Sequence, residues 1–229
     1  MNEKTENIIK VICVVVIIAS VIAFLFLYYA QKNEPFIYEK HLEERVLTVN
    51  DAKYKQYTMT VDLQEMTYYV INVEGEIHDM AVQYNSDNPD AYWKVKLKKG
   101  TYTMRQYAKE LAYDSCVRDN IYYIEALKAG VELTDEEKQM AKRDAKTILE
   151  NASAKWLQVS DFTLDVLYYI EEKLYITSKY VNMLLEDGYT NEELELKGTY
   201  YEKLKEDYTI SVNEKLWDRV IFGNITIDK

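Results

Sequence analysis

The chain has 229 residues, of which 29% are charged and 48% are hydrophobic, and its formal net charge is −11. This composition is typical of a folded globular protein and excludes a disordered tail. The strong negative charge repels phosphate backbones and argues against nucleic acid as a partner. With only 6 glycines and 2 prolines to interrupt it, the chain favours long helices.

The first element is an uncharged, apolar stretch over residues 11–30. At about 1.5 Å per residue, this stretch would cross a bilayer core of about 30 Å. Tyr28 and Tyr29 stand near its end, where tyrosine suits a membrane interface and a signal peptidase would need small residues. We therefore expect a single uncleaved anchor over residues 11–30 rather than a cleaved signal peptide. Residues 1–10 would form a cytoplasmic tail, and the chain beyond the anchor would be extracytoplasmic at the cell membrane.

The segment after the anchor predicts a stalk and then a hairpin. Residues 31–45 are polar and include Pro35, so we expect a stalk before a domain over residues 46–229. β-Forming residues stand on both sides of Asn50 and Asp51, a turn-prone pair, which predicts a short β-hairpin.

A helix is expected next, because Asp62 can act as its N-cap and apolar residues follow at helical spacing. Gly75 should weaken the middle of this helix by about 1 kcal/mol relative to alanine. Residues 85–100 then predict a loop with four lysines, Lys94, Lys96, Lys98 and Lys99. We interpret these lysines as solvated, the alternative being contact with an anionic lipid or an acidic wall component.

Three consecutive helices are predicted between Thr103 and Gly188, and the rest of the domain is organised around them. The first two begin with capping boxes, in which Thr103 is followed by Gln106 and Thr134 by Glu137. Gly130 ends the first helix, where a left-handed residue costs least without a side chain. The third helix is expected to open at Ser160 and to end at Gly188.

The remaining chain predicts short elements. Thr190 and Glu193 form a third capping box, and Gly198 can interrupt the helix that follows. Ile210 and Val212 belong to a brief β-like stretch, and Asn213 can cap a short final helix.

No catalytic or metal-binding set is recognisable in the sequence. His41 and His78 have no partner at metal-ligand spacing, and no glycine-rich phosphate loop is present. Cys13 lies inside the apolar stretch and Cys116 lies on a predicted helix of the domain, so we do not expect the two to form a disulfide. The acidic residues are expected on solvated helix faces. We therefore predict no enzyme, no cofactor and no metal.

The 22 tyrosines are the least ordinary part of the composition. Adjacent residues on a helix point about 100° apart, so one tyrosine of a pair can fill the core while the other stands at its edge. Edge tyrosines suit adaptable binding surfaces, although core packing alone also explains them. The candidate client-binding residues are Tyr68, Tyr69, Tyr122, Tyr123, Tyr168, Tyr169 and Trp217.

The central pattern YAKELAYDSCVRDNIYYIEALKAG, followed by VELTDEEKQMAKRDA, resembles the N-terminal chaperone domain of SurA- and PrsA-type foldases. That domain is related to the client-binding part of trigger factor. VLTVND and TMTVDLQEM look like the opening hairpin of the family, with Asp51 where glycine is usual. YEKLKEDYTISVNEKLWDRV is similar to its closing helix and strand. The resemblance covers residues 46–220.

Many members of this family carry a parvulin prolyl isomerase before the closing segment, but only eleven residues separate Gly188 from Tyr200 here. The resemblance therefore implies a chaperone-like module without the isomerase. The predicted fold is mainly α, with one transmembrane helix, a SurA-like helical domain and a short β-hairpin. The predicted partners are unfolded or exported polypeptides and, through residues 11–30, the lipid bilayer. The alternative function is a cell-envelope scaffold that binds one dedicated partner.

Overall fold

A computed structural model describes residues 19–24, 36–97 and 102–227. The chain divides into two units, Met1–Ile37 and Tyr38–Lys229. In the first unit, residues 19–24 are helical.

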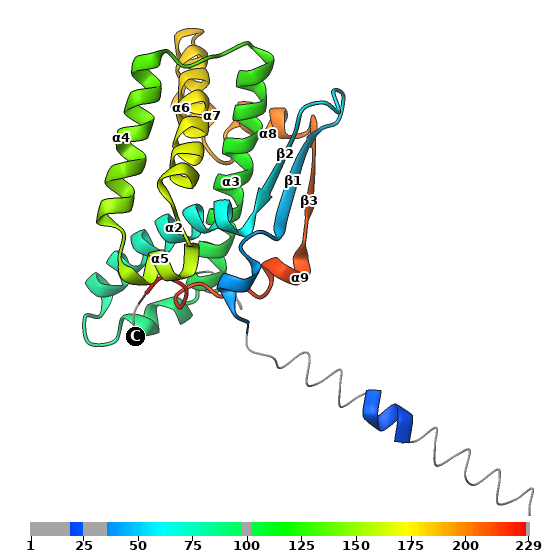
Figure 1. Ribbon diagram of the computed structural model, residues 1–229, viewed down its shortest axis with the longest axis vertical. Coiled ribbons are helices and arrows are strands. Elements are labelled where there is room, and N and C mark those ends of the chain that lie inside the picture. Colours follow the sequence, from blue (N-terminus) through cyan, green and yellow to red (C-terminus); the bar gives the residue numbers. More distant parts are fainter. Residues whose placement is uncertain (1–18, 25–35, 98–101, 228–229) are drawn as a thin grey trace, which may run out of the picture. The chain divides into compact units, whose positions relative to one another are not determined.

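The second unit consists mainly of helices, with three strands (Figure 1). Its described elements in chain order are η1 (Tyr38–His41), β1 (Arg45–Asp51), β2 (Thr58–Asp62), α2 (Leu63–Tyr84), η2 (Pro89–Lys94), α3 (Met104–Lys128), α4 (Asp135–Asn151), α5 (Ala154–Ser160), α6 (Leu164–Glu186), α7 (Asn191–Leu194), α8 (Thr199–Lys205), β3 (Tyr208–Val212) and α9 (Glu214–Trp217). The labels η1 and η2 denote 3₁₀-helices.

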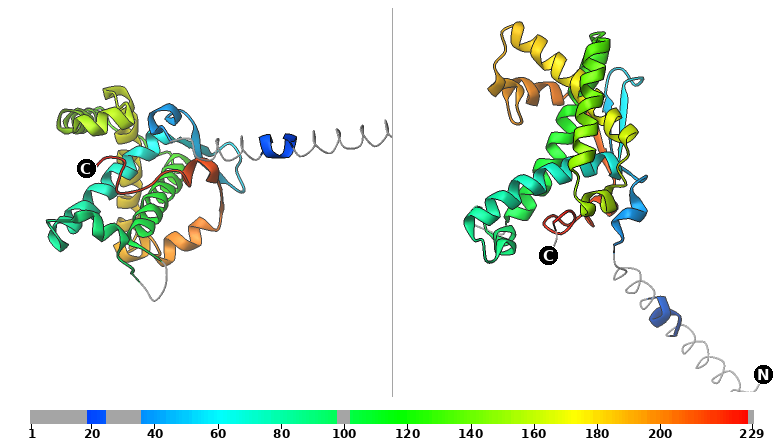
Figure 2. Two further views of the ribbon diagram at one scale, coloured as in Figure 1. Left: turned by 90° about the horizontal axis from the view of Figure 1, so that it is seen from below. Right: turned by 60° about the vertical axis from the view of Figure 1, so that its left-hand side comes forward.

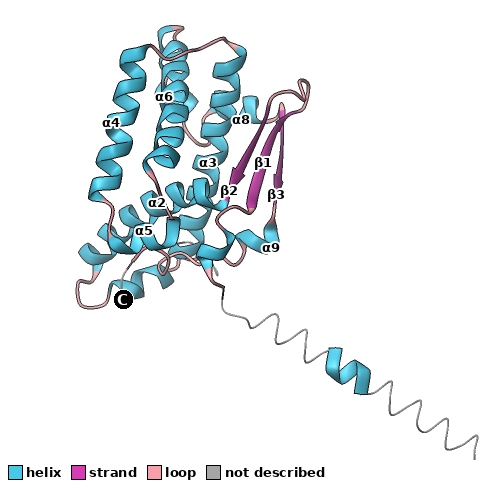
Figure 3. Ribbon diagram, viewed as in Figure 1, coloured by secondary structure: helices cyan, strands magenta, loops and turns pink. Residues whose placement is uncertain are grey.

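The strands form one antiparallel sheet in the order β2-β1-β3, which stands beside α3 (Figure 3). Val49 of β1 lies opposite Met59 of β2 on one side and Ile210 of β3 on the other. The sheet buries Leu47, Val49 and Val61 completely. Strand β3, near the end of the second unit, therefore pairs with β1, its first strand.

Helix α6 lies between α3 and α4 and packs against both of them (Figure 1). Helix α2 packs against α3 and reaches α5 and the sheet. One core cluster, which lies where these helices meet, contains the buried residues Ile71, Ala145, Phe162, Leu167 and Ile170.

The helix boundaries confirm the predicted caps. The capping boxes at Thr103 and Thr134 are formed on both sides, by side chain and backbone. Gly130 and Gly188 have φ angles of 71° and 100°, so both helix ends use the left-handed conformation that glycine allows.

Three local predictions were wrong. The hairpin turns over residues 52–57, because Asn50 still pairs with both neighbouring strands and Asp51 pairs with Tyr208 of β3. Ser160 ends α5, and the N-cap of α6 is Thr163. Residues 85–100 were predicted as a loop, but they include η2, whose Trp93 is buried.

The predicted fold class is corrected in two respects. The hairpin belongs to a three-stranded sheet, because β3 pairs along the free edge of β1. Of the predicted anchor at residues 11–30 only 19–24 are described, and the rest lies outside the described residues. In the part of the chain that the structure describes, no helix combines the length and the hydropathy needed to span a membrane.

Candidate functional site

An apolar cavity of about 330 Å³ opens where α2, α4 and α5 meet. Its lining residues are Tyr68, Ile71 and Asn72 from α2, Thr147, Ile148 and Asn151 from α4, Trp156 from α5, and Phe162 from the loop before α6. Ligand pockets usually begin at about 300 Å³, so this one suits one or two side chains of a larger ligand.

The residues that line the cavity differ in how deeply they are buried. Ile71 and Phe162 are buried in the core cluster, whereas Tyr68, Ile148 and Trp156 pack against that cluster and stay partly exposed. A helix–helix junction that leaves large apolar side chains at the surface marks a place where another apolar group gains by being buried.

Polar groups occur only at a few places along the lining. The Asn151 side-chain nitrogen donates to the Thr147 carbonyl over 2.8 Å, and Asn151 is exposed. Asn72 is exposed on the facing helix. Because an amide side chain offers both a donor and an acceptor, Asn72 and Asn151 can pair with the backbone of a polypeptide.

The predicted client-binding residues lie in several different places. Tyr68 lines the cavity, and its hydroxyl donates to Glu171 Oε1 over 2.8 Å. Tyr69, Tyr122 and Trp217 are buried, Tyr123 and Tyr168 are partly buried, and Tyr169 is 47% exposed. The structure brings Tyr123 and Tyr169 together around the Lys173 ammonium, 5.6 and 6.0 Å from the two ring centres.

Sequence reasoning missed most of the cavity. Trp156 was not recognised, because no helix was predicted between Asn151 and Ser160. A usable signal was present, since Ser153 caps α5 by accepting the N–H of Trp156. Ile148 and Phe162 carry no local mark, because only packing distinguishes a cavity wall from an ordinary core residue.

Several acidic residues are buried, contrary to the prediction that they lie on solvated helix faces. They are Asp51, Glu65, Glu74, Asp119 and Glu171. Each has a partner that compensates its removal from water, as a buried charge requires. Glu65, for example, accepts from the Lys173 ammonium over 2.5 Å, and this pair joins α2 to α6.

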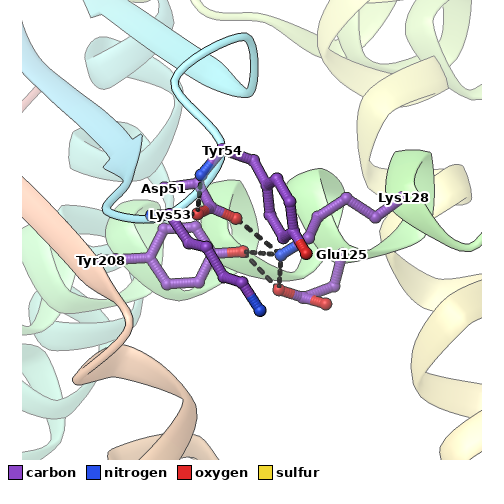
Figure 4. A network of polar contacts seen from close by, with 6 residues as sticks. All are labelled: Asp51, Lys53, Tyr54, Glu125, Lys128 and Tyr208. Carbon is purple, nitrogen blue, oxygen red and sulfur yellow. Dashed lines mark hydrogen bonds and ion pairs between the residues drawn. The ribbon is translucent and has the colours of Figure 1, made fainter.

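A second polar network joins the sheet to the end of α3 (Figure 4). The Lys128 ammonium lies 2.7 Å from Asp51 Oδ2 and 2.6 Å from Glu125 Oε1, and the Tyr208 hydroxyl donates to the same Glu125 oxygen. Burial alone would raise the pKa of Asp51, but the Lys128 ammonium and the backbone N–H groups of Tyr54 and Lys53 outweigh it and lower that pKa.

These side chains satisfy one another, so the network of Asp51, Glu125, Lys128 and Tyr208 supports the sheet and offers no group aimed at a substrate. Among the residues that the structure describes, no three His, Cys, Asp or Glu side chains are grouped to hold a metal ion. The apolar cavity is therefore the best candidate site, and binding is the chemistry that it supports.

The buried carboxyl of Asp119 makes stability depend on pH. Burial raises its pKa, against the opposing effect of the Arg118 guanidinium, which contacts it over 2.8 Å. The folded protein thus binds this proton more tightly than the unfolded chain. The resulting stabilisation is present at low pH and is lost as the pH rises from the ordinary value of 3.8 through the raised folded value.

We therefore expect the stability of the wild type to fall relative to that of Asp119→Asn as the pH rises above 3.8. Denaturant titrations of both proteins over a pH series measure the difference. Arg118 stays charged in both proteins, so losing its partner adds an offset that does not change with pH. A difference that is constant over the series would contradict the prediction.

Comparison with models of protein families, with curated proteins and with solved structures finds no match. The likeness to the SurA- and PrsA-type chaperone domain stays a prediction from the sequence motifs.

Proposed function

We propose that this chain is a non-catalytic, chaperone-like protein that binds unfolded or exported polypeptides. The observation that carries the proposal is the open apolar cavity between α2, α4 and α5, with amide side chains in its lining. An apolar side chain of a client enters the cavity, and Asn72 and Asn151 pair with the client backbone on either side. The affinity for any one segment is modest, because ordering a flexible polypeptide costs free energy.

Client binding is tested with a protein that is kept permanently unfolded by reduction and alkylation of its cysteines. We expect the purified chain to raise the fluorescence anisotropy of the labelled client in a saturable way. Trp156→Ala is expected to weaken this binding about tenfold, because truncating a large aromatic anchor typically costs more than about 1 kcal/mol. If the wild type fails to bind the client at micromolar concentrations, the chaperone proposal loses its support.

Leu157→Ala is the matched control for Trp156→Ala. Leu157 is the next residue on the same helix and is also partly exposed, but it does not line the cavity. Its truncation should leave client binding unchanged. Equal losses in Trp156→Ala and Leu157→Ala would show that α5 acts through its stability and would count against the cavity.

A second candidate function is a scaffold that binds one dedicated partner. The small size of the cavity, about 330 Å³, favours it, because a rigid site of that volume selects a defined side chain. Affinity capture with the wild type and with Trp156→Ala separates the two functions. Many unrelated polypeptides lost together in the variant support the chaperone, and one stoichiometric partner supports the scaffold.

A further inference from the structure

The buried Glu74 of α2 binds the backbone of a segment far away in sequence. Its carboxylate accepts N–H groups from Gly223 (2.5 Å), Ile225 (3.3 Å) and Thr226 (2.8 Å), and also the Thr226 hydroxyl. Glu74 itself is 0% exposed. Charge-assisted hydrogen bonds are stronger than neutral ones, so these four contacts hold residues 223–226 firmly.

Apolar contacts fix the same segment on both sides of the carboxylate. Phe222 is 0% exposed and meets the Trp217 ring edge-on, with 6.2 Å between ring centres. Ile225 is also buried. Gly223 lies against the face of Trp93 with φ 84°, and a Cβ atom there would come within 2.8 Å of that ring.

Residues 221–227 nevertheless form neither helix nor strand. Their order comes from hydrogen bonds to the Glu74 carboxylate and from apolar side-chain contacts, not from helix or strand hydrogen bonds. In Figure 2 the segment runs as a loop beside α2. Residues 222–226, which follow α9 in the chain, thus cover Glu74 of α2 and Trp93 of η2.

We propose that α2 and η2 form a peptide-binding groove that accepts, from another polypeptide, segments of the pattern aromatic–Gly–x–aliphatic–Thr. Residues 222–226 are its resident occupant and shield it until a competing segment displaces them. Glu74 accepts hydrogen bonds from the backbone N–H groups of the segment. Trp93 requires glycine at the second position, because it leaves no room for a Cβ atom there. This groove shares no lining residue with the cavity between α2, α4 and α5 and does not depend on the function proposed for that cavity.

The test uses a labelled peptide with the sequence of residues 219–227, titrated into full-length chains and followed by fluorescence anisotropy. The Gly223→Ala chain cannot seat its own segment, so we expect it to bind the peptide. The wild type is expected to bind at least about tenfold more weakly, because its tethered segment competes at a local concentration on the order of millimolar. Glu74→Gln introduced into the Gly223→Ala chain is expected to weaken binding at least tenfold.

A peptide with alanine in place of its glycine is the matched control and should not bind. Circular dichroism establishes that each variant is folded. If Gly223→Ala does not fold, Thr226→Val is used in its place. It weakens the attachment of the segment less, because it removes only the hydroxyl group that donates to Glu74. The proposal would be overturned if a folded Gly223→Ala or Thr226→Val chain did not bind the peptide. So would binding that Glu74→Gln leaves unchanged, or dimers formed by exchange of residues 221–227 between copies in place of peptide binding.

Discussion

Replacing Lys173 with methionine is expected to lower the free energy of unfolding by about 3–5 kcal/mol. The Lys173 ammonium is 2.5 Å from Glu65 Oε1, and their side chains are only 3% and 8% exposed. Methionine would leave the Glu65 carboxylate buried without its counter-ion, which costs far more than the intact pair contributes. Urea or guanidinium titration of the two proteins measures the loss.

Two further variants make the Lys173 result interpretable. Lys146→Met removes the exposed pair with Glu150, whose side chains are 65% and 64% exposed, and should change stability by less than about 0.5 kcal/mol. The double variant Glu65→Leu, Lys173→Met removes both buried charges and should recover most of the loss. If Lys173→Met were as mild as Lys146→Met, the pair would not be the buried link between α2 and α6 that the structure shows.

Gly198→Ala is expected to destabilise the domain by about 1–3 kcal/mol or more, because it overpacks a rigid site. A Cβ atom at this position would lie 2.3 Å from the carbonyl oxygen of Glu192 and 2.4 Å from that of Glu193. Both atoms belong to the backbone of the α7 region, so neither can move aside as a flexible side chain could. The loss is measured by chemical denaturation.

The opposite result is expected for Gly75→Ala. Gly75 lies inside α2, and a Cβ atom there would meet nothing within 4 Å. Alanine should therefore stabilise the protein by about 0.5–1 kcal/mol through better helix propensity. If both glycine variants changed stability in the same direction, close approach would not be the reason for glycine at position 198.

The elements that could be predicted are those specified by neighbours in sequence. Thr103, Thr134 and Thr190 each bond to a residue three positions further on, so their capping boxes are visible without any tertiary contact. Gly130 and Gly188 likewise mark helix ends through their own backbone angles. These signals give the order of most helices, and the β-like residues Ile210 and Val212 separately indicated the strand β3.

The candidate site could not be predicted in the same way. Of its lining residues only Tyr68 had been singled out, and it was chosen as one tyrosine of a pair. Ile148 lies on α4, which packs against α6, and Trp156 lies on α5, which packs against α2. A cavity is a mismatch between packed surfaces, and no single surface contains that information.

The acidic residues show where local patterns stop being informative. The sequence pattern predicted that the acidic residues of the helices face solvent, yet Glu65 and Glu74 are both buried. Their partners, Lys173 and Gly223, are 108 and 149 positions further along the chain. Caps, turns and helical periodicity follow from residues a few positions apart and could be deduced from the sequence. The charged links and the self-bound segment required the fold, because burial of a charge depends on a counter-group that only the folded chain brings near.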